Sequence, residues 1–189
     1  MKQFFTILYM TWASVAMSQS IVFPPHFEQL LTAAGIDFFE PADAPYRDLK
    51  PHKNRLEKYD FGIVSKEEKL EIRYSIKPYK TDEFLSQNPH LLTMRAVASI
   101  ATNEEDYIIS ALEMGQQALQ NDFNADWGMT YFFTPKKEFS RLPHCRMIAL
   151  YKEGKGTAFV FYLFDDANNE ALDTRYFALR FLKDTVVID

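Results

Sequence analysis

A run of seven consecutive apolar residues, Ala-Phe-Val-Phe-Tyr-Leu-Phe at 158–164, constrains the fold more than any other feature. Its aromatic and β-branched residues favour a strand. Successive side chains of a strand point to opposite faces, so this one would present apolar surface on both sides. Such surface has to be covered by other parts of the chain. We therefore expect residues 157–165 to form a central strand of a sheet that is covered on both faces.

Two more strands are expected just before this one. Residues 126–134 and 146–151 are also rich in aromatic and aliphatic residues. The sequence Glu-Gly-Lys-Gly at 153–156 is typical of a tight turn between antiparallel strands. Together the three strands are expected to form a meander.

An earlier hairpin is indicated by two strand-like segments, residues 59–65 and 70–79, on either side of the polar turn 66–69. In the second segment Leu70, Ile72, Tyr74 and Ile76 alternate with Glu71, Arg73, Ser75 and Lys77. This alternation predicts an outer strand with one buried face and one face in solvent. Shorter strands are expected at 36–40, near Tyr46 in the proline-containing loop 41–54, and at 186–188.

Helical spacing of apolar residues predicts four helices. The first covers residues 27–34 and ends at Gly35, a residue that readily takes the left-handed conformation after a helix. The second covers residues 89–101. Thr102 and Glu105 have capping-box spacing for a third, which would run to Leu119. Asn168 and Asn169 are suitable caps for a last helix through Phe181.

These elements predict one domain, residues 19–189, of the α+β class. The composition, 47% hydrophobic and 25% charged, is typical of a globular chain, and no linker divides it. We expect an antiparallel β-sheet flanked by helices on both faces, an α/β/α sandwich. The two central helices would be inserted between the hairpin and the meander.

Residues 1–18 are expected to be a cleaved export signal. Lys2 precedes a mostly apolar run at 4–15, and the small residues Ala16 and Ser18 suit a cut before Gln19. The alternative is an uncleaved membrane anchor, for which the run is short. With the signal removed, the mature protein would be periplasmic or secreted, and not an integral membrane protein.

The net charge limits the kinds of partner that the chain attracts, and the cysteine content limits its disulfides. The formal net charge of −5 gives no overall attraction to nucleic acid or anionic lipid. Cys145 is the single cysteine, so no intramolecular disulfide can form.

The order of these elements resembles the PsbP-like family. The resemblance is carried by Gly-Ile-Asp-Phe-Phe-Glu-Pro at 35–41, the hairpin at 59–79, the central helices, the meander ending at 158–164 and the last helix through Phe181. It covers about residues 27–189 and contains no diagnostic motif, so no functional residue is carried over. It implies an α/β/α sandwich and an accessory role in binding or assembly, by analogy of fold. A cystatin-like α+β fold is the alternative.

Residues of the types used in catalysis form no known signature. His26, His52, His90 and His144 lack the spacing of a metal-binding pair. His144 and the adjacent Cys145 would point to opposite faces of a strand. Gly-Lys-Gly-Thr at 154–157 lacks the frame of a phosphate loop and is interpreted as a turn. We therefore predict no catalytic residue, no metal and no cofactor.

The densest group of oxygen ligands is Asp165, Asp166, Asn168, Glu170 and Asp173. A calcium loop beginning at Asp166 would need Gly and Glu where the chain has Ala171 and Phe177. We interpret the segment as the capped entry of the last helix. Whether Asp165, Asp166, Asn168 and Glu170 bind a cation stays open.

The most basic stretch contains Lys50, Lys53, Arg55 and Lys58. It adjoins the proline-containing loop, and loops often carry function. It is either a solvated turn or a docking surface for an acidic partner, and we select these four residues as the candidate partner-binding site.

The leading functional hypothesis is an exported, non-catalytic accessory that binds a protein partner or helps an assembly of the cell envelope. One alternative is a carrier of a small apolar ligand or lipid, held in a cleft among the aromatic residues. The other is a hydrolase with a dispersed site.

Overall fold

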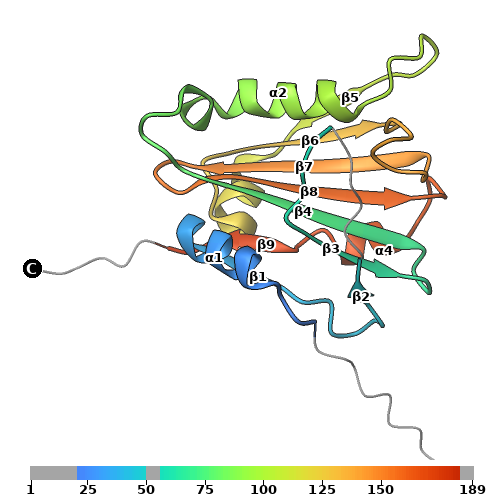
Figure 1. Ribbon diagram of the computed structural model, residues 1–189, viewed down its shortest axis with the longest axis horizontal. Helices are drawn as coiled ribbons and strands as arrows, with labels where there is room; N and C mark the ends of the chain where they lie inside the picture. Colours follow the sequence, from blue (N-terminus) through green and yellow to red (C-terminus); the bar gives the residue numbers. More distant parts are fainter. Residues whose placement is uncertain (1–20, 50–55, 184–189) are drawn as a thin grey trace, which may run out of the picture.

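The computed structural model describes residues 21–49 and 56–183 (Figure 1). The expected export signal, the strand expected at 186–188 and three of the basic residues, Lys50, Lys53 and Arg55, lie outside the described residues. Within the described part, no helix has both the length and the apolar character needed to cross a membrane.

The fold is α+β and is built on a seven-stranded antiparallel sheet with the order β2-β3-β4-β8-β7-β6-β5. Its strands are β2 (Arg47–Asp48), β3 (Phe61–Ser65), β4 (Leu70–Pro78), β5 (Ser110–Glu113), β6 (Trp127–Phe133), β7 (His144–Lys152) and β8 (Gly156–Phe164). A small second sheet pairs β1 (Ile36–Phe38) with β9 (Leu179–Phe181). The hairpin, the meander and the short strands expected at 36–40 and near Tyr46 are confirmed.

Strand β8 lies at the centre, between β4 and β7, and all nine of its residues are buried. One of its faces carries Val160 and Tyr162, which belong to a core that also contains Phe27 and Phe181. The other carries Phe159 and Phe161, which belong to a separate core. The expectation of a central strand covered on both sides is confirmed.

Helices α1 (Pro25–Ala34) and α2 (Pro89–Ile100) belong to these two separate cores and lie on opposite sides of the strands (Figure 1). Both begin with proline, whose missing N–H costs nothing in a first turn. Helix α1 ends at Gly35, which has φ 56°, as expected. The remaining helical pieces are η1 (Phe84–Gln87), α3 (Gln116–Ala118), the π-helical turn η2 (Leu119–Phe123) and α4 (Ala171–Thr174).

The expected helix from Thr102 to Leu119 is wrong except for its last turn, where α3 and the start of η2 are helical. Residues 103–113 instead form an exposed extension that ends in β5. The Thr102 hydroxyl accepts from the N–H of Glu104, 3.4 Å away, rather than capping a helix. The edge of β6 supplies backbone partners for residues 110–113, and this pairing replaces the bonds that a helix would have made.

The expected last helix through Phe181 is also wrong beyond its first turn. Only Ala171–Thr174 is helical, and the chain then enters β9. In β9 the buried residues Leu179 and Phe181 are two apart and flank the less buried Arg180, which is the period of a strand. Pairing with β1 therefore outweighs the helical spacing.

The expected outer position of β4 is wrong as well, because β4 lies inside the sheet between β3 and β8. Its expected solvent-exposed face is also wrong, because the residues of that face are buried or half-buried. Arg73 and Ser75 are buried. The Arg73 guanidinium is paired with Glu71, donates to the Phe139 carbonyl at 2.7 Å, and stacks on the rings of Tyr59 and Phe139. A charged residue at this depth needs such partners.

Candidate functional site

The basic site chosen from the sequence is represented in the described residues by Lys58 alone. Its side chain is exposed, and its carbonyl accepts a hydrogen bond from the Ser75 hydroxyl at 2.9 Å. The assignment of Lys50, Lys53, Arg55 and Lys58 to a docking surface stays a prediction.

The acidic segment around α4 serves as a turn into the helix. The Asp166 carboxylate accepts from the N–H of Asn168 at 2.9 Å, and the Asn169 side-chain oxygen accepts from the N–H of Ala171 at 3.0 Å. The Asn169 amide also donates to the Glu68 carbonyl at 2.8 Å. Across the described ranges, no three His, Cys, Asp or Glu side chains are arranged to hold a metal ion.

The residues with nucleophilic or acid–base chemistry have separate structural partners. Cys145 is buried in β7, and burial raises the pKa of its thiol, which keeps the thiol protonated. His144 stacks on Phe164 on the opposite face, as expected from the alternation along the strand. His26 lies 3.8 Å from a carboxylate oxygen of Asp60, and His90 packs against Trp127. These three histidines, the ones within the described residues, have three different surroundings and do not converge with Cys145 on a common partner.

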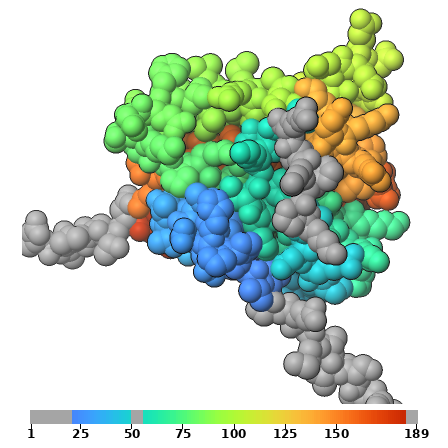
Figure 2. Space-filling view, in the orientation of Figure 1, coloured from blue at the N-terminus to red at the C-terminus, as the bar shows by residue number. Residues whose placement is uncertain are grey.

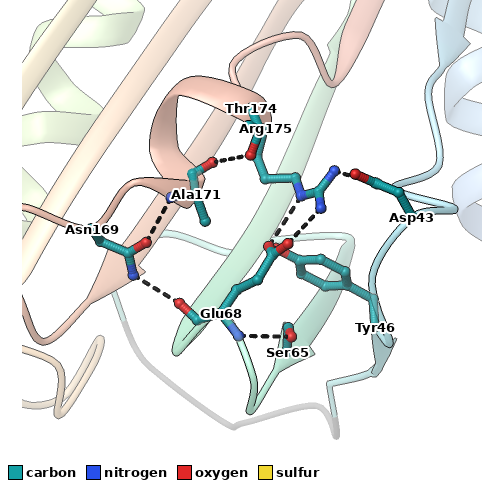
Figure 3. Close-up of polar contacts among 8 residues, drawn as sticks. All are labelled: Asp43, Tyr46, Ser65, Glu68, Asn169, Ala171, Thr174 and Arg175. Carbon is teal, nitrogen blue, oxygen red and sulfur yellow. Dashed lines mark hydrogen bonds and ion pairs between the residues drawn. The ribbon is translucent and has the colours of Figure 1, made fainter.

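The most connected polar group is the cluster of Asp43, Tyr46, Glu68 and Arg175, here called the Arg175 cluster (Figure 3). Arg175 donates through Nε to Glu68 at 3.0 Å, through Nη2 to the other oxygen of Glu68, and through Nη1 to Asp43 at 2.6 Å. The Tyr46 hydroxyl donates to Glu68 at 2.5 Å. These bonds join the segment that leads into β2, the turn between β3 and β4, and the chain just after α4.

The electrostatics of the Arg175 cluster favour its ionised form. Burial alone would raise the pKa of Glu68, but the hydrogen bonds from Arg175 and Tyr46 outweigh burial and lower the pKa. The hydrogen bond from Arg175 also lowers the pKa of Asp43. Burial, together with the bond to Glu68, raises the pKa of Tyr46. Because each charge has a bonded opposite charge, the cluster acts as a structural clamp beside β2.

A cavity of about 140 Å³ adjoins this clamp and is lined by Asp43, Tyr74 and Arg175 together with apolar side chains. The hydroxyl of Tyr74 is buried and has no hydrogen-bond partner within the described chain. A buried hydroxyl of this kind normally bonds to ordered water, for which the cavity has room.

The opposite edge of the sheet has a different character. Every residue from 103 to 113 is exposed, and we call this segment the acidic arm. It contains four acids, Glu104, Glu105, Asp106 and Glu113, and neither Lys nor Arg. Its large apolar residues are also exposed: Tyr107 49%, Ile108 81%, Ile109 47% and Leu112 60%. Figure 2 shows this yellow-green segment projecting from the body of the molecule.

The backbone of β5 offers unused hydrogen-bonding groups. The N–H of Met114 donates to the Gly128 carbonyl of β6 at 3.2 Å. Backbone groups alternate in direction along a strand, so Leu112 and Ser110 also point toward β6, whereas Ala111 and Glu113 point away. Among the described strands, β5 pairs with β6 alone. The outward groups of Ala111 and Glu113 therefore face an open edge.

Comparisons of this chain with protein-family models, with curated proteins and with solved structures found no match. The sequence interpretation missed the acidic arm as a candidate site, because its apolar residues were assigned to the buried face of a helix. Two signals in the sequence point the other way. Residues 102–113 contain acids and no base, and Ile108 and Ile109 are adjacent β-branched residues that favour extended structure.

Proposed function

We propose that this chain is an exported, non-catalytic binding protein that docks an extended segment of a protein partner along β5 and the acidic arm. The observation that carries the proposal is an open sheet edge flanked by exposed apolar side chains. Natural sheets normally shield such edges, because an unpaired strand recruits other strands. Addition of a partner strand to a sheet edge is a recurring mode of peptide recognition.

The composition of the arm identifies the partner's chemistry. Its four acids create a negative surface, and its exposed Ile108 and Leu112 offer apolar contacts. Charges on a partner usually complement those on the surface that it meets. The fitting occupant is an extended segment in which basic residues alternate with apolar ones.

The proposal is tested with two acetylated nine-residue peptides, one alternating Lys with Val and the other alternating Glu with Val. Nuclear magnetic resonance titration of the labelled protein measures binding and locates it. We expect the Lys peptide to shift the amide signals of residues 104–113, and the Glu peptide to have at least about tenfold weaker affinity. Equal binding of both peptides, or shifts confined to other surfaces, would overturn the proposal.

A backbone variant separates strand pairing from simple charge attraction. Ala111→Pro removes an outward N–H without removing a bond to β6, and proline is tolerated on edge strands. Ala111→Val keeps the N–H and serves as the matched control. The Lys peptide should bind Ala111→Pro about tenfold more weakly, a difference of about 1.4 kcal/mol, and Ala111→Val as it binds wild type. Unchanged binding to Ala111→Pro would exclude pairing at this edge.

We also propose that the architecture is a PsbP-like α/β/α sandwich. The two cores on opposite faces of the sheet and the positions of α1 and α2 support it. The accessory role that the resemblance implies agrees with a docking protein, by analogy alone.

Export is part of the same proposal, supported by the apolar run at 4–15 and the small residues Ala16 and Ser18. Mass spectrometry of the protein from its native host should find Gln19 as the first residue of the mature chain. A chain that begins at Met1 and stays with the cytoplasmic fraction would contradict export.

A further inference from the structure

An open pocket of about 450 Å³ lies beside β5 and is lined by residues of β5, β6 and β7 and of the segment around α4. Leu112, Phe132 and Tyr176 contribute apolar or aromatic surface to it. Arg146 is its cationic group, and Glu113 and Asp173 are its anionic groups. The pocket therefore combines both signs of charge with an apolar wall.

Arg146 differs from the other arginines that stack on aromatic rings. Its guanidinium lies 5.8 Å from the ring centre of Phe132 and 5.1 Å from that of Tyr176. Arg73 and Arg175 have similar ring contacts, but each of these two is also paired with a carboxylate. Within the described residues, Arg146 forms no ion pair, its Nε is buried without a partner, and its Nη1 makes one long bond of 3.4 Å to the Leu172 carbonyl.

An arginine in this state can bind an anionic group. The Arg146 side chain is half-buried, and leaving a buried donor unpaired has an energetic cost that a bound acceptor would remove. A carboxylate is the acceptor that best matches the guanidinium fork, whose N–H groups donate charge-assisted hydrogen bonds to it. The ring contacts hold the guanidinium in place and so reduce the entropy lost on binding.

The two acids of the pocket determine what else the ligand must carry. Glu113 and Asp173 are exposed, and neither forms an ion pair with Arg146 although all three line the same pocket. A ligand with a negative charge alone would meet repulsion from both carboxylates. A ligand that also carries an ammonium group would meet attraction from them instead.

We propose that this pocket binds a small zwitterion with an apolar side chain, of the amino-acid class. The ligand's carboxylate pairs with Arg146, its ammonium group faces Asp173 and Glu113, and its side chain packs against Phe132 and Tyr176. This inference goes beyond the docking function. The two are tested separately, because Ala111→Pro removes the outward N–H used in docking and changes none of the side chains that line the pocket.

Three probes with the same phenyl side chain test the charge requirement: L-phenylalanine, 3-phenylpropanoate, which lacks the ammonium group, and 2-phenylethylamine, which lacks the carboxylate. Each is titrated into the labelled protein and followed by nuclear magnetic resonance. We expect L-phenylalanine to shift signals around Arg146 and Tyr176, and each of the other probes to bind at least about tenfold more weakly, which is about 1.4 kcal/mol. Equal affinity for 3-phenylpropanoate would overturn the requirement for a zwitterion, and no binding of L-phenylalanine would overturn the site.

Variants locate the binding. Arg146→Gln should abolish the binding of L-phenylalanine, and Asp173→Asn should weaken it about threefold to tenfold, because an exposed charge contributes less. Arg95→Gln removes an exposed positive charge on α2, outside the pocket, and should leave the affinity unchanged. If Arg146→Gln does not fold, the affinity of Asp173→Asn decides the test, because Asp173 is exposed and its substitution should leave the fold intact. Binding that is unchanged in Asp173→Asn, or that survives in a folded Arg146→Gln, would overturn the assignment.

Discussion

The two edges of the seven-stranded sheet differ in how they are protected. At one edge, β2 has two residues, Arg47 and Asp48, both charged, and the Arg175 cluster fastens the segment that leads into it. At the other edge, the four residues of β5 are all exposed, and the acidic arm to which they belong carries Ile108 and Leu112 in solvent. A short, charged edge discourages pairing with other chains, whereas a longer apolar edge invites it. The asymmetry indicates which edge is available to a partner.

The largest effect is expected where the protected edge is held. Arg175→Ala leaves Glu68 without its cationic partner and should lower the free energy of unfolding by about 3 kcal/mol. Urea denaturation measures the change. Arg47→Ala, which removes an exposed charge from β2 itself, is the control and should stay within about 0.5 kcal/mol of wild type. A loss for Arg175→Ala no larger than that of the control would show that the cluster does not fasten this edge.

A low pH should also destabilise the edge that the Arg175 cluster holds. A carboxyl group whose pKa is lowered in the folded state stabilises the fold above its unfolded pKa, and that stability is lost as the pH falls through the folded pKa. The lowered pKa values of Glu68 and Asp43 therefore predict a loss of stability as the pH drops below 4.5, the ordinary pKa of Glu68. Urea titrations at several pH values should show a shallower acid loss in Arg175→Ala. Parallel curves for the two proteins would contradict this.

A smaller effect, on binding alone, is expected at the open edge. The double variant Ile108→Ser and Leu112→Ser removes two exposed apolar contacts, and should weaken binding of the Lys–Val peptide about tenfold, or 1.4 kcal/mol. Its thermal stability should change little, because neither side chain is part of a core. Fluorescence anisotropy and thermal denaturation measure the two quantities. A large loss of stability would mean that the arm belongs to the folded body rather than to a docking surface.

The smallest expected effect is that of salt concentration on peptide binding. The acids of the arm are exposed, so their attraction for a basic peptide is screened by ions. Raising the salt concentration from about 0.05 to 0.5 M should weaken binding of the Lys–Val peptide about threefold. The variant with Glu104→Gln, Glu105→Gln and Asp106→Asn should show a smaller dependence on salt. The same dependence in both proteins would remove these acids from the docking surface.

The central strands could be predicted because the residue pattern that identifies each strand lies within a short stretch of sequence and favours a strand over a helix. In β8 both faces are apolar, and in the β3–β4 hairpin a polar turn separates two strand-like segments. The polar residues of β4 misled the prediction of its exposed face. Arg73 can be buried because Glu71 pairs with it and because the Phe139 carbonyl and the rings of Tyr59 and Phe139 surround it. Apart from Glu71, these partners are distant in the sequence.

The two wrong helix predictions, at 102–119 and through Phe181, lie where strand pairing competes with helical spacing. Leu179 and Phe181 fit both a helix and a strand, and the pairing of β9 with β1 decides between them. Residues 110–113 fit the face of a helix until β6 offers its edge. The same competition hid the candidate docking edge, since exposure of Ile108 cannot be read from spacing alone. Arg146 was not selected because its lack of a carboxylate partner is a property of the folded chain.

Site-specific crosslinking in the native host tests whether a partner meets β5 rather than β2 or the basic segment. A photoreactive benzoylphenylalanine is placed in turn at Ala111 on β5, at Asp48 on β2 and at Lys58. We expect a discrete crosslinked species from Ala111, lost in the Ile108→Ser and Leu112→Ser background, and none from Asp48 or Lys58. A crosslinked species from Asp48 or Lys58 with none from Ala111 would place the partner on another surface.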